Sequence, residues 1–225
     1  MRKILIISGT GNLGKAIINY FNNKNYFIYF SSTSKIKINK MKNHKRVVGV
    51  VCNLLSEKSL EGFIKKAYLN NKYFDLVINC SGIFKYDNLE SLNYKSLVDT
   101  FKVNTFSTIL INKFVKKYKK DKKVTKIISI GSSSSYEGFK NTISYCGSKH
   151  ALLGVVKSIN RTYHQKKIIN FSINPGSLDN KMGRSVRNID KKKLIKQKEV
   201  IKVIEMIQSL DSFGFTEDIF LKRFG

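Results

Sequence analysis

Hydrophobic positions follow two different spacings along this chain. Short runs of consecutive apolar residues, many of them β-branched, are separated by longer stretches in which apolar residues recur every three or four positions. Such runs are typical of strands buried on both faces, and the helical spacing predicts amphipathic helices. The strands are expected at residues 3–7, 26–30, 47–51, 74–79, 124–130, 168–173 and 219–221.

The helical spacing fills most of the intervals between these strands. It is found at residues 13–21, 60–68, 89–104, 109–118, 148–163 and 194–210. Because strands and helices alternate, we expect an α/β fold with a single doubly wound, mostly parallel sheet and helices on both faces. The length of 225 residues, with no linker or internal repeat, predicts one domain over residues 1–225. Ligands are then expected outside the carboxyl ends of the strands.

A glycine-rich turn follows the first predicted strand and opens the first helix. Glycines in this context let the backbone approach a pyrophosphate, and the helix N-terminus offers free N–H groups to it. The turn therefore predicts dinucleotide binding. Its candidate contacts are Gly9, Thr10, Gly11, Asn12, Leu13 and Gly14.

The second predicted strand runs into a serine-rich segment that ends at Lys35. A site for NAD places a carboxylate near this point to hold the ribose 2′-hydroxyl, yet no acidic residue precedes Glu57. Ser31, Ser32 and Lys35 are better suited to a 2′-phosphate, so NADP is favoured over NAD. The alternative is a serine-rich loop that holds no ligand.

Tyr145 and Lys149 are four residues apart, which places them on one face of a helix. A lysine charge at that distance is expected to lower the phenol pKa from its usual ~10, which would suit proton transfer at an alcohol or ketone oxygen. The same spacing more often joins a core aromatic ring to a solvated amine. The spacing of Tyr145 and Lys149 alone therefore does not indicate a catalytic pair, and the other motifs of the chain must decide.

Lys and Arg total 42 against 15 Asp and Glu, which gives a net charge of +27. One interpretation is a polyanionic partner. The other, which we favour, is biased coding, because Lys, Asn and Ile are abundant while Trp is absent and Pro occurs once. On that interpretation lysines cover every solvated face, and we expect no specific nucleic-acid partner.

Membrane, metal and disulfide sites are not expected. No apolar segment approaches the ~20 residues of a membrane span. Cys52, Cys80 and Cys146 lie far apart without metal-ligand spacing, as reduced thiols in a cytoplasmic protein would.

In their order and spacing, these motifs together resemble the short-chain dehydrogenase/reductase family, whose members have a Rossmann fold. The resemblance covers nearly the whole chain. Besides the glycine-rich turn it rests on Asn79-Cys80-Ser81-Gly82, Asn104, Ser132, Tyr145, Lys149 and Asn174-Pro175-Gly176. The turn is one residue shorter than is usual in single-domain members.

The resemblance implies roles for these residues. Tyr145 would be the general acid, Lys149 would lower its pKa and bind the nicotinamide ribose, and Ser132 would hold the substrate oxygen. Asn104 would anchor a proton-relaying water, and Ser133 would replace Ser132 if the register slipped by one. Further cofactor contacts would be Asn53, Asn79, Ser81, Gly82, Tyr145, Lys149, Pro175 and Gly176.

The implied activity is an NADP(H)-dependent oxidoreductase acting on a carbonyl or alcohol, working as a dimer or tetramer. Two alternatives stay open: a 3-oxoacyl-[acyl-carrier-protein] reductase, and a non-catalytic NADP-binding protein on the same fold. The segment expected to cover the substrate carries Lys181, Arg184, Arg187 and Lys191–Lys193. These cations would suit an anionic substrate, or they only keep a loop solvated.

Overall fold

The computed structural model describes residues 1–41, 45–163, 167–186, 190–210 and 216–223. Its centre is one seven-stranded sheet in the order β3-β2-β1-β4-β5-β6-β7, and every neighbouring pair is parallel. The predicted doubly wound α/β fold is confirmed. The strands are β1 (Lys3–Ile7), β2 (Phe27–Ser32), β3 (Val47–Val51), β4 (Leu76–Asn79), β5 (Thr125–Ile130), β6 (Ile168–Pro175) and β7 (Asp218–Leu221).

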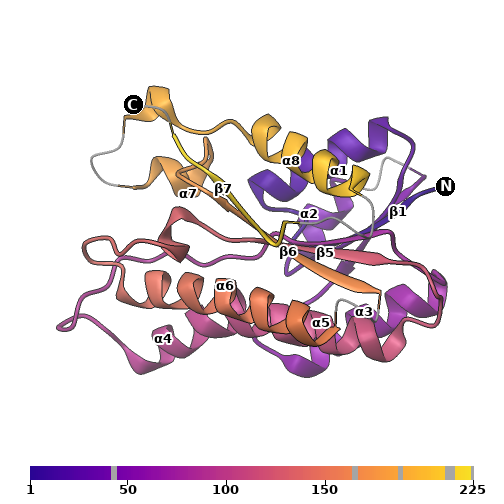
Figure 1. The fold of residues 1–225 in the computed structure, drawn as a ribbon, viewed down its shortest axis with the longest axis horizontal. Helices are drawn as coiled ribbons and strands as arrows, with labels where there is room; N and C mark the ends of the chain where they lie inside the picture. The colour runs from indigo at the N-terminus through magenta and orange to yellow at the C-terminus, as the bar shows by residue number, and fades with distance from the viewer. Residues whose placement is uncertain (42–44, 164–166, 187–189, 211–215, 224–225) are drawn as a thin grey trace.

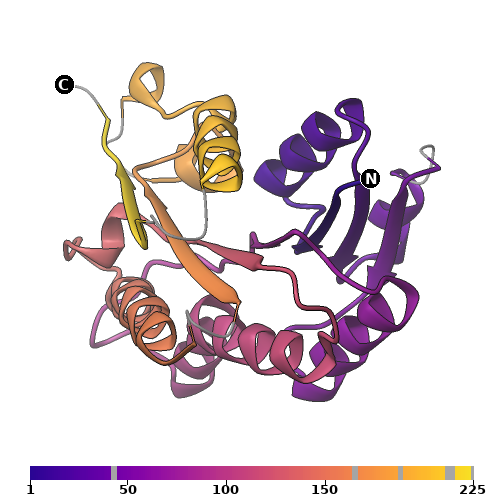
Figure 2. The same ribbon diagram turned by 45° about the vertical axis from the view of Figure 1, so that its right-hand side comes forward.

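Helices cover both faces of the sheet (Figures 1 and 2), with α1 and α8 on one side and α3 to α6 on the other. No helix in the described part of the chain is long and apolar enough to cross a membrane. The helices are α1 (Asn12–Asn23), α2 (Lys35–Asn39), α3 (Glu57–Asn70), α4 (Tyr94–Phe101), α5 (Ser107–Tyr118), α6 (Ile143–Tyr163), α7 (Lys181–Arg184) and α8 (Gln197–Ser209).

The central strands are apolar at every position because each of their faces meets a helical layer. In β1, Ile4 and Ile6 belong to the core under α1 and α8, while Leu5 and Ile7 belong to the core under α3 and α5. All four side chains are fully buried. This double burial explains why the strands read as uninterrupted apolar runs.

Three helical features differ from the sequence prediction. α6 begins at Ile143, five residues before the predicted start, so Tyr145 and Lys149 lie inside the helix. The helix predicted at residues 89–104 begins at Tyr94, because the Asn93 side chain accepts a hydrogen bond from the Ser96 N–H at 3.2 Å. α2 was not predicted; it is one short turn capped by Ser34, with too few residues to show a period.

The carboxyl ends of β5 and β6 are joined by a buried hydrogen-bond network around Asn174. Its Oδ1 accepts hydrogen bonds from the hydroxyls of Ser135 (3.0 Å) and Ser172 (2.9 Å). Its Nδ2 donates to Asp218 of β7 at 2.8 Å. Gly131 lies against this amide so closely that a Cβ atom there would be 1.8 Å from Asn174 Oδ1. The network fixes the loop that follows β5.

We therefore expect Gly131→Ala to destabilise the protein. A methyl group would displace Asn174, and overpacking of this kind costs about 1–3 kcal/mol of unfolding free energy. Gly154→Ala is the matched control, since no atom lies within 4 Å of the Cβ added at this exposed position of α6. That change should stabilise by ~0.5–1 kcal/mol through helix propensity. Urea unfolding of both variants measures the difference, and equal stabilities would contradict it.

Candidate active site

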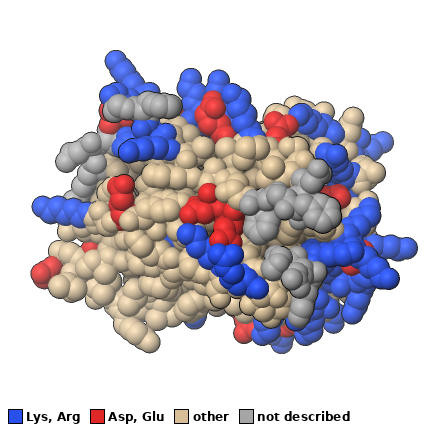
Figure 3. Space-filling model, viewed as in Figure 1, with Lys and Arg blue, Asp and Glu red and all other residues tan. Residues whose placement is uncertain are grey.

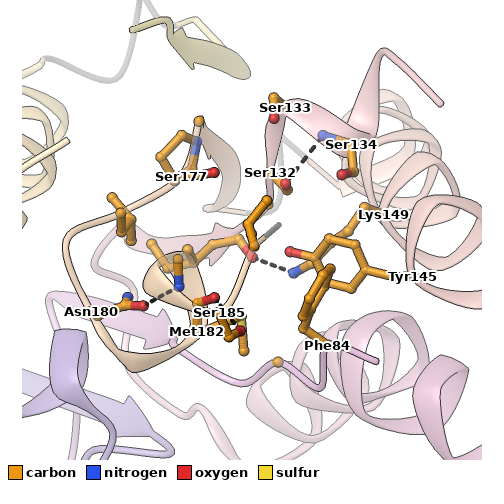
Figure 4. A pocket seen from close by; sticks show the side chains of 18 of the residues that line it. Phe84, Ser132, Ser133, Ser134, Tyr145, Lys149, Ser177, Asn180, Met182 and Ser185 are labelled. Atoms are coloured by element: carbon orange, nitrogen blue, oxygen red, sulfur yellow. Dashed lines mark hydrogen bonds between the residues drawn. The ribbon is translucent and has the colours of Figure 1, made fainter. Parts of the chain in front are cut away.

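A cavity of about 1110 Å³ opens at the carboxyl ends of β1, β4, β5 and β6 (Figure 4). It is bordered by the turn before α1, by the segments after β4 and β5, by the start of α6 and by the chain after β6. The predicted site residues that line it are Gly11, Asn12, Leu13, Gly14, Ser81, Gly82, Ser132, Tyr145, Lys149, Pro175 and Gly176. Sequence segments far apart are thus brought together where a parallel sheet places its ligands.

The glycine-rich turn has the geometry of a phosphate-binding turn. Ser8 adopts a φ of 61°, and a Cβ on Gly14 would lie 2.7 Å from the Gly9 carbonyl oxygen. α1 begins after exposed Gly11 without a side-chain cap. The first N–H groups of a helix have no partner within the helix, so those of α1 are free to bind an anion in the cavity. The residues present therefore fit the pyrophosphate of a dinucleotide.

Ser31 and Ser32 support this turn from behind. The Ser31 hydroxyl accepts a hydrogen bond from the Ser8 N–H at 3.0 Å, and the Ser32 hydroxyl lies 2.7 Å from the Thr10 hydroxyl. Both serines are buried, whereas Lys35 is exposed at the start of α2. Of the side chains predicted to meet a 2′-phosphate, Lys35 is the one with a solvated charge.

Four further cofactor candidates lie outside the cavity lining. Gly9 and Thr10 form the inner part of the turn, and Asn53 is exposed after β3, where its Oδ1 accepts a hydrogen bond from the Leu55 N–H at 3.0 Å. Asn79 is buried. Its side chain donates to Thr108 (3.0 Å) and accepts from the Ser81 hydroxyl (2.7 Å), so it shapes the segment that reaches the cavity.

Tyr145, Ser132 and Lys149 converge on one side of the cavity (Figure 4). Phe84 packs edge-on against the Tyr145 ring, with centroids 4.9 Å apart. Burial raises the pKa of the Tyr145 phenol, and its hydrogen bond with Ser132 acts in the opposite direction. The sequence predicted a net lowering by Lys149; in this structure desolvation is the larger influence, so the pKa direction is reversed.

Lys149 is almost fully buried, although a charged amine prefers water. Its Nζ donates to the Ile130 carbonyl oxygen at 2.8 Å and lies 5.8 Å from the centre of the Tyr145 ring. Burial lowers the pKa of Lys149 to about 8. The amine therefore stays mostly protonated at neutral pH, and it can exchange a proton close to that pH.

Asn104 lies behind the cavity in a π-helical turn, Lys102–Phe106, between α4 and α5. Its side chain accepts from the Ile83 N–H at 2.8 Å and donates to the Ser148 hydroxyl at 2.9 Å. A Cβ on Gly82 would lie 3.9 Å from Asn104 Oδ1 and 4.0 Å from Lys149 Nζ. Asn104 thus ties the segment after β4 to the helix that carries Tyr145, while its water-relaying role stays a prediction.

Comparison with known proteins now identifies the fold family. The family described as short chain dehydrogenase matches residues 2–191. This chain belongs to the short-chain dehydrogenase family. The resemblance proposed from the sequence motifs is confirmed, and with it the Rossmann-type α/β fold of an oxidoreductase family.

Curated relatives of this short-chain dehydrogenase include two proteins named 3-oxoacyl-[acyl-carrier-protein] reductase FabG. The protein from Buchnera aphidicola subsp. Acyrthosiphon pisum is 29% identical over 199 residues, which cover 86% of this chain and 81% of that protein. The protein from Haemophilus influenzae is 22% identical, with 93% and 92% covered. Both alignments span most of each protein.

Solved structures share the fold at lower sequence identity. A single-residue variant of actinorhodin polyketide ketoreductase with NADPH superposes with a TM-score of 0.87 at 16% identity, covering 98% of this chain and 94% of the other. ElxO with NADP bound gives a TM-score of 0.87 at 20% identity, with 98% and 96% covered.

The segment after β6 was expected to border the substrate with cationic side chains, and among the described residues one of these side chains does line the cavity. Lys181 and Met182 of α7 line the cavity, and Figure 4 shows Met182 across the cavity from Tyr145. Arg184 is paired with Asp179 at 2.6 Å, so its charge is already engaged. Arg187, the second half of the proposed anion clamp, lies outside the described residues.

Asp87 is a candidate site residue that the sequence analysis missed. It is buried at the end of the segment carrying Phe84, and its carboxylate accepts hydrogen bonds from the Ser144 hydroxyl and from the Ser144 N–H (3.1 Å). A carboxylate at the start of a helix is stabilised by free N–H groups and by the helix dipole. Asp87 therefore fixes the first turn of α6, next to Tyr145.

We expect Asp87→Ala to lower both stability and turnover. The substitution leaves the Ser144 donors buried without an acceptor, at a cost of about 1–3 kcal/mol, and it releases the turn that orients Tyr145. Asp87→Asn keeps an acceptor oxygen and should restore most of the loss. Thermal melts and kcat for a carbonyl substrate measure the two effects.

The matched control is Asn93→Ala, which removes the cap of α4 and typically costs ~1 kcal/mol. The hydrogen bonds that the described structure gives Asn93 go to Ser96 and Leu97 of α4, not to α6, so stability should fall while kcat is retained. If Asp87→Ala lowered stability alone, as this control does, Asp87 would be a structural residue without influence on Tyr145.

Proposed function

We propose that this chain is an NADP(H)-dependent oxidoreductase that interconverts a carbonyl compound and an alcohol. The observation that carries the proposal is one cavity bounded by Tyr145, Ser132 and Lys149 on one side and by the uncapped start of α1 on another. Proton-transfer groups and an anion-binding helix end are thereby placed around the same space. When bound, the nicotinamide supplies or accepts the hydride.

The protein residues manage the proton in this reaction. With its pKa raised by burial, the Tyr145 phenol stays protonated at neutral pH and can donate to a carbonyl oxygen as that oxygen gains negative charge. The Ser132 hydroxyl, hydrogen-bonded to Tyr145, is placed to hold the same oxygen. Lys149, with a pKa of about 8, can return a proton to tyrosinate after each turnover. These pKa directions suit the proton-donating role that reduction of a carbonyl requires.

The preferred cofactor is NADP(H) in this proposal. Exposed Lys35 at the start of α2 supplies a cation beyond β2, and no carboxylate is present there to bind a ribose 2′-hydroxyl. Two solved structures of the same fold are complexes with NADPH or NADP, which is consistent with this preference. Cytoplasmic location and a homo-oligomeric state stay predictions.

A 3-oxoacyl-[acyl-carrier-protein] reductase is the more specific candidate. The curated relatives carry that name, and the described cavity lining includes Lys140, Lys181, Lys222 and Arg223 against a single acidic residue, Glu137. Such a lining suits an anionic acyl substrate. A non-catalytic NADP-binding protein is less favoured, because the buried amine and phenol would then be retained without use.

Tyr145→Phe should abolish most of the activity while leaving the fold intact. The ring still packs against Phe84, but the proton donor is lost, and general acid catalysis contributes ~10²–10⁴-fold to the rate. NADPH oxidation with a panel of carbonyl compounds measures kcat. Near-parental turnover by the variant would exclude Tyr145 as the general acid.

A pair of serine variants serves as the control for this assignment. Ser132 is hydrogen-bonded to Tyr145, whereas Ser133 begins the short 3-10 turn that follows. Ser132→Ala should therefore reduce kcat, and Ser133→Ala should leave it near the parental value. The opposite result would show that the working serine is one residue further along the chain.

NADPH should bind more tightly than NADH, and the difference should depend on Lys35. A charge-assisted contact to the 2′-phosphate is worth ~1.5–3 kcal/mol, or about 10- to 100-fold in affinity. Lys35→Ala should remove that preference, whereas Lys37→Ala, two residues along α2 and on another face, should keep it. Fluorescence titration with both cofactors tests this, and equal affinities in the parent would refute it.

A further inference from the structure

The positive charge of this protein is distributed unevenly between the two ends of the sheet. In the loops that lead from strands to helices, residues 8–11, 33–34, 52–56, 80–93, 131–142 and 176–180, the cations are Lys85 and Lys140. The other cations at this end lie in the bordering helix starts or after β7, among them Lys35, Lys58, Lys95, Lys181, Lys222 and Arg223. We call the described residues that lead into strands β1 to β6 the strand-entry face: residues 1–2, 24–26, 40–41, 45–46, 71–75, 119–124 and 167. Its cations are Arg2, Lys24, Lys40, Lys45, Arg46, Lys72, Lys119, Lys120, Lys122, Lys123 and Lys167.

Biased coding alone does not produce this arrangement. It raises the frequency of lysine at every solvated position, whereas more than half of the described strand-entry face is cationic and the cations at the opposite end lie mainly in helix starts rather than in the loops. In Figure 3 blue side chains gather at the right-hand end of the molecule, where β1 starts in Figure 1, and further blue groups lie along the top and at the upper left.

Helix ends explain some of these cations. In a parallel α/β fold the helix C-termini collect where the strands begin, and cations are favoured there by the helix dipole. Lys24 follows α1 directly and pairs with Glu205, and Lys119 follows α5 and pairs with Asp121. Each of these two lysines therefore has a carboxylate partner in addition to its position at a helix end.

A second group of cations on the strand-entry face has no such partner. Its members are exposed, and among the described residues their side chains make no hydrogen bond or ion pair: Lys45, Lys72, Lys120, Lys122 and Lys167. They precede β3, β4, β5 and β6. Of the acidic residues nearby, Asp121 is paired with Lys119, and Asp75 accepts the Lys3 N–H at 2.7 Å. Among the described residues, no carboxylate is paired with any of these five lysines.

The cations form a continuous row because the strands that they precede are neighbours. Backbone hydrogen bonds connect Arg2 with Phe27, Arg46 with Ile28, and Lys167 with Thr125. Lys3 and Lys123 both lie over the Tyr73 ring, at 5.1 and 3.8 Å from its centre. From β3 to β6 the row crosses five strand intervals, or about 24 Å at ~4.8 Å each.

We propose that the strand-entry face binds the phosphate backbone of a nucleic acid without reading its sequence. A row of cations that includes five unpaired lysines matches a polymer of regularly spaced phosphates, and their neutralisation releases counterions. No helix or ribbon projects from the described part of this face to enter a groove, so base readout is not expected. Membrane surfaces are less favoured, because these segments carry one exposed large hydrophobic residue, Met1, in their described part.

The proposed surface is independent of the proposed reductase site. The catalytic cavity opens at the carboxyl ends of the strands, and the strand-entry face lies at their other ends, a strand length of roughly 17–20 Å away. A nucleic acid bound there would leave the cavity accessible. Binding and catalysis can therefore be tested separately in the same protein.

The experiment compares two variants that carry the same net charge. In the first, Lys45, Lys72, Lys120, Lys122 and Lys167 are each changed to Gln. In the second, five exposed lysines without partners among the described residues, Lys37, Lys58, Lys95, Lys196 and Lys198 from α2, α3, α4 and the start of α8, are changed to Gln. Fluorescence anisotropy with a mixed-sequence 30-base-pair duplex, DNA and RNA, is measured at 50 and 200 mM KCl.

The parent should lose roughly 500-fold in affinity between the two salt concentrations if five phosphates are contacted, from a slope of about −4.5 in log K against log salt. The strand-entry variant should bind at least ~100-fold more weakly than the parent at 50 mM KCl and lose most of that slope. The control variant should stay within about fivefold of the parent, because its charges act only at a distance.

Several results would overturn the proposal. Equal losses in both variants would show that total charge, not this face, is responsible. Absence of parental binding at 50 mM KCl, strong preference for one sequence over its scrambled form, or tighter binding to phosphatidylglycerol vesicles than to either duplex would each refute it. Thermal melts verify folding of both variants, and the carbonyl reduction assay reports separately on the proposed reductase function.

Discussion

The parallel alignment of the strands is the constraint on which the other features of this protein depend. Because every strand runs in the same direction, all the segments that follow strands meet at the carboxyl ends of the strands. All the segments that precede strands meet at the opposite, amino ends. The carboxyl ends collect the glycine-rich turn, Ser132 and the chain after β6 around one cavity. Burial of both sheet faces leaves these two ends as the places where polar groups can gather.

At the first of these ends, the fold keeps the amine of Lys149 out of water. Lys149 is surrounded by protein, and one backbone carbonyl, that of Ile130, accepts its hydrogen bond. Such burial is unfavourable for an amine, and the lowered pKa expresses that cost. Tyr145 is buried beside it with its pKa displaced upwards. The environment thus keeps the Tyr145 phenol protonated and brings the pKa of the Lys149 amine closer to neutral pH. Opposite pKa shifts of two neighbouring groups are one way in which a site assigns them different roles in proton transfer.

The sequence was sufficient to predict the sheet and the order of the site motifs, since both arise from local patterns. Apolar runs mark strands that are buried on both faces, and glycine or serine clusters directly after them mark the cavity edge. Residues that act across long sequence separations were not predictable in this way. Asp87 lies in an ordinary polar loop, and its role depends on Ser144, which is 57 positions away.

Ser31 and Ser32 illustrate the same limit. Their composition indicated hydroxyls available to a phosphate, but the fold uses them to hold Ser8 and Thr10 in the turn. Whether a serine hydroxyl is available to a ligand depends on which other residues pack against the end of its strand. The local sequence pattern does not contain this information. The π-helical turn at Asn104 is likewise invisible to a period of 3.6 residues, because it interrupts an otherwise continuous helix between α4 and α5.

The positions of the lysines depend on the fold as well as on the composition of the chain. A high frequency of lysine sets the total charge, but each position must also tolerate a cation. Near the starts of helices the dipole disfavours positive charge, and near their ends it favours it. The parallel fold places helix starts at the cavity end and helix ends at the strand-entry face, where Lys24, Lys72 and Lys119 follow the last turns of α1, α3 and α5. The fold thus determines where the abundant lysines lie. Lys72 and Lys122 on the strand-entry face have no carboxylate partner among the described residues, and they are available to a polyanion.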